Sequence, residues 1–234
     1  FTIYLKVMSS KKRSKLWVFG DSFMADNANW IHEISRKSNT RVNHLGHGGA
    51  SVQHLLVDLH KYSHLLQEDD RVIIGISHPA RFFLKEKHYH SWINIEYYKE
   101  ELYKKIQIEA FKDFIVQLYD TESDNLYKGA IVSHIINVMI PKLGTKHVQY
   151  VFTVDDEVYT KEPTLLIDPL PVPSMYTTYR RFIETNYNVD LEDNNKINEL
   201  MRGPNHWLDH TEFHQYFWDI YEEHFSILYS RPLV

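Results

Sequence analysis

The chain has 234 residues, which is enough for one domain with a full hydrophobic core. It contains no cysteine, and this excludes a cysteine nucleophile, thiolate metal sites and a disulfide framework. The net charge of -5 arises from 31 acidic and 26 basic residues without a long block of either sign, so the sequence predicts no nucleic-acid partner.

The N-terminal region shows no export signal. No apolar stretch reaches the ~18 residues that a membrane span needs. Residues 1–7 are apolar but too short for the core of a signal peptide with its flanks, and Met8 is a candidate natural start. We therefore expect an N-terminal segment over residues 1–14, a single domain over residues 15–234, and a soluble protein that is cytoplasmic by default.

The first predicted strand ends in a turn that can present a hydroxyl group. Residues 16–19 are apolar and are followed by Gly20, Asp21 and Ser22. At a strand-to-helix turn, the free amide groups and the dipole of the helix face any negative charge that forms beside the serine. Asp and Ser are also ordinary turn and N-cap residues. The motif alone therefore leaves a nucleophile and a plain turn both open, and we assign Asp21 to organising the turn.

Two further strands end in comparable segments. The strand near residues 41–45 runs into a glycine-rich stretch, residues 46–51, where glycines let the backbone approach a substrate and aim amide groups at it. Residues 72–76 form a continuous apolar run, typical of a strand buried on both faces, and Ser77 follows them. Near the C-terminus, His206 stands in a Gly-Pro-Asn-His-Trp segment just before the last predicted helix.

Helices are predicted between and after these strands because apolar residues recur at helical spacing. They pass through Trp30, Ile31 and Ile34, through Val52, Leu55, Leu56 and Leu59, and through residues 96–119 and 126–139. A fourth strand is predicted over residues 147–154, and four prolines indicate an irregular insertion at about residues 155–200. The alternation predicts one α/β domain with a three-layer, doubly wound, mostly parallel sheet and a ligand crevice at the carboxyl ends of its strands.

With these motifs in this order, the chain resembles the SGNH hydrolases, also called the GDSL-like family. The resemblance covers roughly the first 80 and the last 35 residues, and the middle poorly. It implies a flavodoxin-like three-layer fold and serine esterase activity. By the same resemblance, Ser22 is the nucleophile, Gly49 donates a backbone amide to the oxyanion together with the amide of Ser22, and His206 is the base.

Two positions depart from the family pattern. Ser77 stands where the family has an Asn that donates to the oxyanion, and Gly203 stands where it has the Asp that precedes the catalytic His. Losing an oxyanion donor can cost roughly 3 to 4 kcal/mol of transition-state stabilisation. We therefore regard His47, His78 and Arg81 as candidates for the missing polar group.

The expected function is hydrolysis of an ester through an acyl-enzyme on Ser22 with His206 as base, and O-deacetylation of a carbohydrate is one candidate reaction. The substrate is then a small-molecule or carbohydrate ester, and neither a metal nor an organic cofactor is required. One alternative is a catalytically degenerate SGNH-fold binding or structural module, because fold alone does not establish activity.

A second alternative is a metal-dependent hydrolase, because His206, His210 and His214 are spaced four residues apart. Asp209 and Glu212 argue against it, since they form an N-cap with a capping-box partner. That pattern predicts a last helix that begins after Asp209 and leaves His206 in a loop. His210 and His214 are then expected to be surface histidines.

Overall fold

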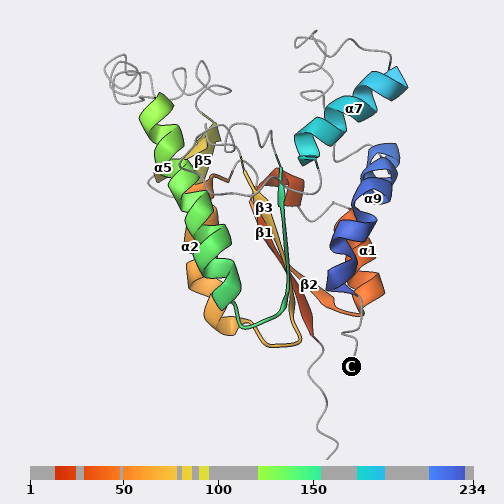
Figure 1. Ribbon diagram of the computed structural model, residues 1–234, viewed down its shortest axis with the longest axis horizontal. Coiled ribbons are helices and arrows are strands. Elements are labelled where there is room, and N and C mark those ends of the chain that lie inside the picture. Colours follow the sequence, from red (N-terminus) through yellow and green to blue (C-terminus); the bar gives the residue numbers. More distant parts are fainter. Residues whose placement is uncertain are drawn as a thin grey trace, which may run out of the picture.

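A four-stranded sheet lies at the centre of the molecule (Figure 1). The computed structural model describes residues 14–24, 29–47, 50–77, 81–85, 90–94, 121–153, 173–187 and 211–229. The strands are arranged in the order β2-β1-β3-β6, and all three pairings are parallel. Their bounds are β1 Lys15–Gly20, β2 Arg41–Gly46, β3 Arg71–Ile76 and β6 His147–Phe152. The predicted α/β class with a mostly parallel sheet is confirmed.

Helices cover both faces of this sheet (Figure 1). Helices α2 and α5 lie on one face, and α1 and α9 lie on the other, with α7 packed against α9. Their bounds are α1 Asn29–Ser38, α2 Val52–Tyr62, α5 Thr121–His134, α7 Met175–Tyr187 and α9 Thr211–Phe225. Short 3-10 turns span Ser22–Met24, Ser63–Leu65, Ile140–Lys142 and Ser226–Leu228.

Alternate residues of each central strand enter opposite cores, as the two-residue repeat of a strand requires. In β1, Leu16 and Val18 pack with the helices α1, α7 and α9. Trp17 and Phe19 pack with α2 and α5 instead. A strand that is apolar at every position is therefore explained by burial on both of its faces.

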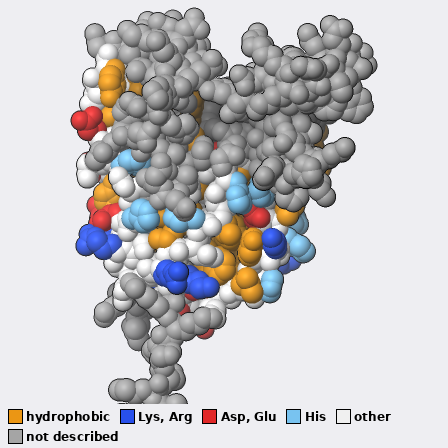
Figure 2. Space-filling view, turned by 180° about the vertical axis from the view of Figure 1, so that it is seen from behind, with side chains coloured by type: hydrophobic (Ala, Val, Ile, Leu, Met, Phe, Trp, Pro, Cys, Tyr) orange, Lys and Arg blue, Asp and Glu red, His pale blue; other side chains and the backbone are white. Residues whose placement is uncertain are grey.

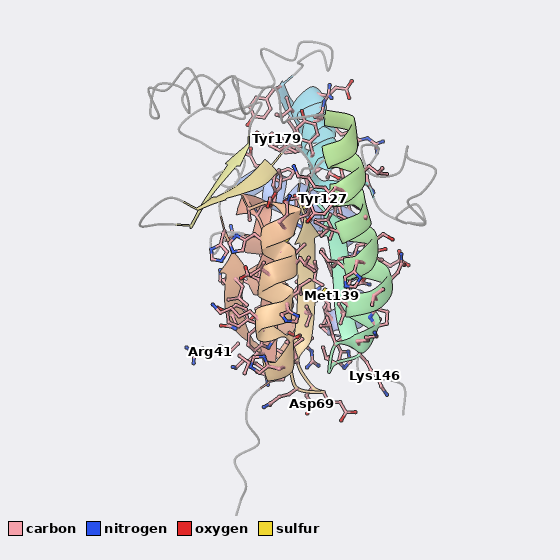
Figure 3. The ribbon with its side chains drawn as sticks, turned by 90° about the vertical axis from the view of Figure 1, so that its left-hand side faces the viewer. Arg41, Asp69, Tyr127, Met139, Lys146 and Tyr179 are labelled. Atoms are coloured by element: carbon pink, nitrogen blue, oxygen red, sulfur yellow. The ribbon has the colours of Figure 1, made fainter. Side chains whose placement is uncertain are left out.

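Because the strands are parallel, all their amino ends lie along one side of the sheet, here called the amino edge, and all their carboxyl ends lie along the opposite side, the carboxyl edge. Arg41 begins β2, while Asp69 and Lys146 lie just before β3 and β6. All three lie at the same end of the molecule, opposite to Tyr179 of α7 (Figure 3). The carboxyl ends of the strands therefore meet at the other edge, where a doubly wound sheet binds its ligands.

Helix α7 corrects the prediction of an irregular insertion, which was wrong over Met175–Tyr187. Ser174 starts this helix because its Oγ accepts a hydrogen bond from the backbone N–H of Thr177, 3.1 Å away. The apolar residues Met175, Tyr179 and Phe182 follow at helical spacing and are buried. The prolines of this region precede the helix, so they do not interrupt it.

Other elements match the predictions only in part. Helix α1 contains Trp30, Ile31 and Ile34 as expected, and Ser22 lies before it in a 3-10 turn over Ser22–Met24. Helix α5 continues as a π-helical turn over Ile135–Met139. An antiparallel hairpin of β4 (Arg81–Lys85) and β5 (His90–Asn94) was not predicted.

Two further predictions concern the helix over residues 96–119 and the absence of a membrane span. The helix expected over residues 96–119 lies outside the described residues. Over the described ranges, no helix has the length and apolar character needed to cross a membrane.

Candidate functional site at the carboxyl edge of the sheet

Two predicted site residues flank the place where the strand order reverses. The chain passes from β1 to β2 on one side and then returns to β3 on the other. Ser22 follows β1 and Ser77 follows β3, so both lie at the carboxyl edge beside the point between these two strands. Ligand crevices in doubly wound sheets form at such a switch point.

Asp21 is fully buried and holds the turn that contains Ser22. Its Oδ1 accepts a hydrogen bond from the backbone N–H of Phe23 at 2.9 Å, and its backbone carbonyl accepts one from the N–H of Met24 at 3.0 Å. Its Oδ2 lies 2.8 Å from Oγ1 of Thr153, the residue that follows β6. One carboxylate therefore connects the end of β1 with the end of β6.

Thr153 also fixes the end of β3. Its backbone N–H donates to the carbonyl of Ile76 at 2.9 Å, and its hydroxyl lies 3.1 Å from the same carbonyl oxygen. Ser77 comes directly after Ile76 and is 1% exposed. The backbone that leads into Ser77 is thus tied to the backbone that leads into Ser22 through Asp21 and Thr153.

Met24 fills the space above three strand ends. A methyl group added to Gly20, Gly46 or Gly75 would lie between 2.6 and 2.7 Å from an atom of Met24, which is closer than side chains pack. Gly20 also has φ +141, a conformation that side chains rarely adopt. The three glycines allow the turn after β1 to fold down on the sheet, which sets the position of the Ser22 backbone.

The segment after β2 is held against the same turn. The backbone N–H of His47 donates to the carbonyl of Gly20 at 2.9 Å, and the N–H of Ala50 donates to the carbonyl of His47 at 3.0 Å. Ser51 then caps α2, because its Oγ accepts from the N–H of His54 at 3.4 Å. The backbone on either side of the predicted oxyanion glycine, Gly49, is therefore fixed.

A cluster of His47, His54 and Asp58 occupies this edge and was not predicted as a unit. Nε2 of His54 lies 3.1 Å from Oδ2 of Asp58, and Nε2 of His47 lies 3.5 Å from the same oxygen. The two imidazole rings stack with their centroids 4.5 Å apart. The pKa of His47 is lowered by burial and by His54, while Asp58 acts in the opposite direction.

The signal for two of the three residues of this cluster was present in the sequence. His54 and Asp58 are four residues apart on a predicted helix, which puts both on one face. His47 belongs to the segment after β2, and only the docking of that segment beside α2 brings it to them. The sequence suggested a polar role for His47, and the structure places its side chain beside His54 and Asp58, which were not predicted as site residues.

The structure brings Asp21, Ser22, Ser77 and His47 to one edge of the sheet, and for Ser22 it describes the backbone alone. Arg81 begins β4, and its side chain is not among the described groups. The other predicted positions lie outside the described residues: Gly49, His78, Gly203, His206, Asp209 and His210.

His214 was predicted to lie at the surface, and this was wrong, because it is 4% exposed. Helix α9 is buried over a broad face that includes the neighbouring Phe213 and Phe217, and His214 belongs to that face. Helix α9 is described from Thr211 onwards, and Asp209 lies outside the described residues.

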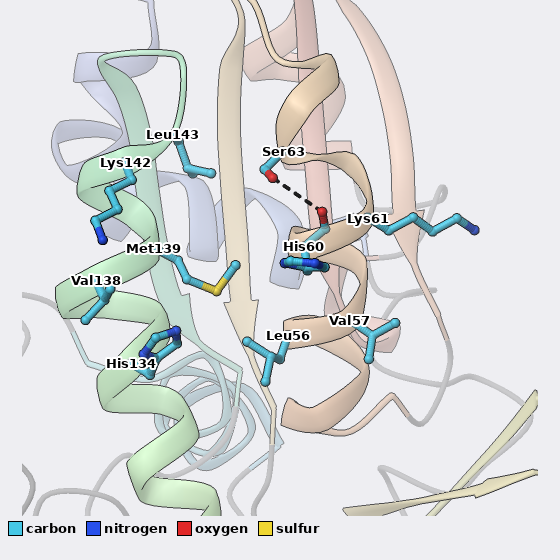
Figure 4. Close-up of a pocket in the computed structure, with 10 residues that line it drawn as sticks. All are labelled: Leu56, Val57, His60, Lys61, Ser63, His134, Val138, Met139, Lys142 and Leu143. Atoms are coloured by element: carbon cyan, nitrogen blue, oxygen red, sulfur yellow. Dashed lines mark hydrogen bonds between the residues drawn. The ribbon is translucent and has the colours of Figure 1, made fainter.

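A groove of about 890 Å³ lies elsewhere, between α2 and the end of α5 (Figure 4). It is lined by residues from the second half of α2 and from the last turns after α5, among them Leu56, His60, Met139 and Leu143. These turns lead towards the amino ends of the strands. The groove therefore does not coincide with the predicted site.

No protein-family model matches the chain, and a search of curated proteins likewise returned no match.

Proposed function

We propose that the chain is a serine acyl hydrolase of the SGNH type. In this proposal it cleaves a carboxylic ester through an acyl-enzyme on Ser22 with His206 as base. The substrate class is a small acyl ester or an O-acetylated carbohydrate.

The observation that carries the proposal is the position of two serines at the switch point of the sheet. The order β2-β1-β3-β6 corresponds to the first four strands of the flavodoxin-like order 2-1-3-4-5, in which the ligand lies between the first and third strands. Ser22 and Ser77 follow those two strands. The carboxylate of Asp21 is occupied by Phe23 and Thr153, which favours a structural role for it and leaves the nucleophile to Ser22.

In the proposed reaction, His206 takes the proton of the Ser22 hydroxyl, and the Ser22 oxygen attacks the ester carbonyl. The backbone amides of Ser22 and Gly49 donate to the oxyanion, and the hydroxyl of Ser77 replaces the amide of the family's Asn. The alcohol leaves with the proton held by His206. Water then attacks the acyl-enzyme, with His206 as base, and releases the acid. Because Gly203 replaces the family's Asp, His206 works either in a dyad or with an acceptor from elsewhere in the chain.

The test is turnover of a short-chain aryl ester by the full-length protein after chelator treatment. Ser22→Ala, His206→Ala and the double variant should lose about the same activity, because members of one catalytic unit are not additive. Ser63→Ala, a half-buried serine at the end of α2, is the matched control and should keep full activity. An active Ser22→Ala variant would contradict the proposal, and turnover that requires a metal would favour the metal-dependent alternative.

A second substitution series locates the missing oxyanion donor. Ser77→Ala, His78→Ala and Arg81→Ala are compared by kcat/KM with the same ester. Ser77→Ala should lose roughly 2.7 to 4 kcal/mol of transition-state stabilisation, which is typical of an oxyanion donor. A loss of that size in His78→Ala or Arg81→Ala instead would move the donor to that residue. Full activity in all three would leave the oxyanion to backbone amides alone.

A further inference from the structure

We propose that His47, His54 and Asp58 form a binding site for a divalent transition-metal ion, with Zn²⁺ as the ion to test first. The site goes beyond the proposed ester hydrolysis, which uses none of these three side chains as nucleophile or base. Two imidazoles and one carboxylate are a donor set that suits zinc and related first-row ions.

The donor atoms already stand at the spacing of ligands around one ion. Metal bonds of about 2.0 to 2.2 Å in a tetrahedral arrangement put neighbouring ligand atoms about 3.4 Å apart. Oδ2 of Asp58 lies 3.1 Å from Nε2 of His54 and 3.5 Å from Nε2 of His47. One donor atom from each of the three residues lies within 4.8 Å of the other two. The three side chains can therefore reach one ion without a rearrangement of the backbone.

Two of the ligands are held rigidly and the third closes the site. His54 and Asp58 project from consecutive turns of α2, and their side chains are only 12% and 11% exposed. The helix is anchored on the sheet by Leu55 and Leu59, which are buried. His47 lies on the segment after β2, and its side chain is 49% exposed. The remaining coordination positions of an ion would then face solvent on the side of His47 and take water, as in zinc sites with three protein ligands.

The ring geometry indicates which side chain moves. The planes of the two imidazoles are within 9° of parallel, whereas a nitrogen lone pair lies in the plane of its ring. A shared ion therefore requires one ring to tilt out of the stack. His47 is the exposed ring, so we expect it to turn towards the ion while His54 and Asp58 keep their places.

Burial of the Asp58 carboxylate favours binding of a cation at this site. Asp58 as a whole is 8% exposed, and a carboxylate in such a position is costly unless charge or hydrogen bonds compensate it. Its Oδ2 contacts the two imidazoles. A divalent ion between all three groups would compensate the carboxylate more fully than the imidazoles do.

The chain has 15 histidines, and several reach the surface on the face shown in Figure 2, so the test needs a histidine control. Chelator-treated full-length protein is titrated with Zn²⁺ by calorimetry. The wild type should bind one ion at this site. Removal of an outer-shell partner costs about 10- to 100-fold in metal affinity, so His54→Gln and Asp58→Asn should each weaken binding by at least about tenfold. His60→Gln removes an exposed histidine from the same helix and should leave the affinity unchanged.

Cobalt gives a readout that does not depend on ester turnover. Co²⁺ bound to the wild type should show the visible absorption of a four- or five-coordinate ion, and His47→Gln should reduce it. His47→Gln changes an exposed side chain, so it keeps the test decisive even if the α2 variants unfold; far-ultraviolet circular dichroism monitors their folding. A wild type without tight Zn²⁺ binding, or folded variants that bind as tightly as the wild type, would overturn the site and leave Asp58 as a partner of His54 alone.

Discussion

Two buried aspartates lie at opposite edges of the same sheet. Asp70 stands at the amino edge, where it accepts hydrogen bonds from the backbone N–H of Lys15 at 2.8 Å, Nε1 of Trp17 at 2.9 Å and the N–H of Gln67 at 3.0 Å. Asp21 stands at the carboxyl edge and accepts from Phe23 and Thr153. Each carboxylate ties neighbouring segments together by accepting hydrogen bonds from their donors.

The surroundings of the two carboxylates differ. Around Asp70, the donors come from strand and turn residues to which we assign no role other than holding the fold together. Around Asp21, glycines at three strand ends admit Met24, and the turn carries a serine. The buried carboxylate of Asp70 thus contributes to stability alone. The buried carboxylate of Asp21 also sets the position of residues proposed to carry the chemistry.

The largest effect on stability should follow from Asp70→Ala. The change leaves the indole N–H of Trp17, which is buried, and two backbone N–H groups without their acceptor. Each stranded donor costs about 1 to 3 kcal/mol, and we expect a loss of about 3 kcal/mol in the free energy of unfolding, measured by urea denaturation. The folded fraction should keep its kcat. Asp69→Ala, at the exposed neighbouring position, should stay within about 0.5 kcal/mol of the wild type. A loss of kcat in folded Asp70→Ala would erase the distinction between the two edges.

Two substitutions of Asp21 should distinguish a structural role of this residue from a chemical one. Asp21→Ala strands the N–H of Phe23 and leaves the Thr153 hydroxyl with the carbonyl of Ile76 as its acceptor, so we expect about 1 to 3 kcal/mol of destabilisation together with a loss of activity. Asp21→Asn keeps an acceptor for Phe23. Its amide can donate to Thr153, whose hydroxyl then donates to the carbonyl of Ile76, 3.1 Å away. Asn should therefore be milder than Ala in both unfolding free energy and turnover, whereas an inactive but stable Asn variant would give Asp21 a chemical role.

Glycine substitutions should show a smaller difference between the edges. A methyl group at Gly75 would lie 2.6 Å from Cγ of Met24, but at Gly144, near the amino edge, its closest contact is the Leu66 carbonyl at 3.2 Å. Overpacking typically costs about 1 to 3 kcal/mol, so Gly75→Ala should destabilise more than Gly144→Ala in urea denaturation. Met24→Ala removes the two closest clashing atoms and leaves Cγ2 of Thr153, at 2.9 Å, as the next closest. The Gly75→Ala/Met24→Ala double variant should therefore be more stable than the sum of the single effects predicts. Strict additivity would show that Met24 does not set the close packing of this edge.

Much of the sheet could be predicted because burial on both faces requires apolar residues at every strand position. The runs at residues 16–19 and 72–76 carry this signal, and the structure confirms both strands. Helix α7 was not predicted because the prolines that precede it are typical of irregular segments, although Met175, Tyr179 and Phe182 have helical spacing. The β4–β5 hairpin was missed because residues 86–89 contain no glycine, asparagine or aspartate to signal a tight turn.

Only those site residues that closely follow a predicted strand could be placed from the sequence. Ser22 and Ser77 each follow an apolar strand, so their edge of the sheet was foreseeable from local sequence. The link from Asp21 to Thr153 spans 132 residues, and the contact of His47 with Asp58 depends on how α2 docks beside β2. Neither distance leaves a local pattern in the sequence, so both required the assembled fold.

The most direct test of the proposed function is labelling of the full-length protein with a fluorophosphonate probe, followed by mass spectrometry of the modified peptide. The reagent forms a covalent bond with an activated serine, so the label should be found on Ser22, disappear in Ser22→Ala and persist in Ser63→Ala. Labelling that is absent from the folded wild type, or that remains in Ser22→Ala, would contradict the assignment of Ser22 as the nucleophile.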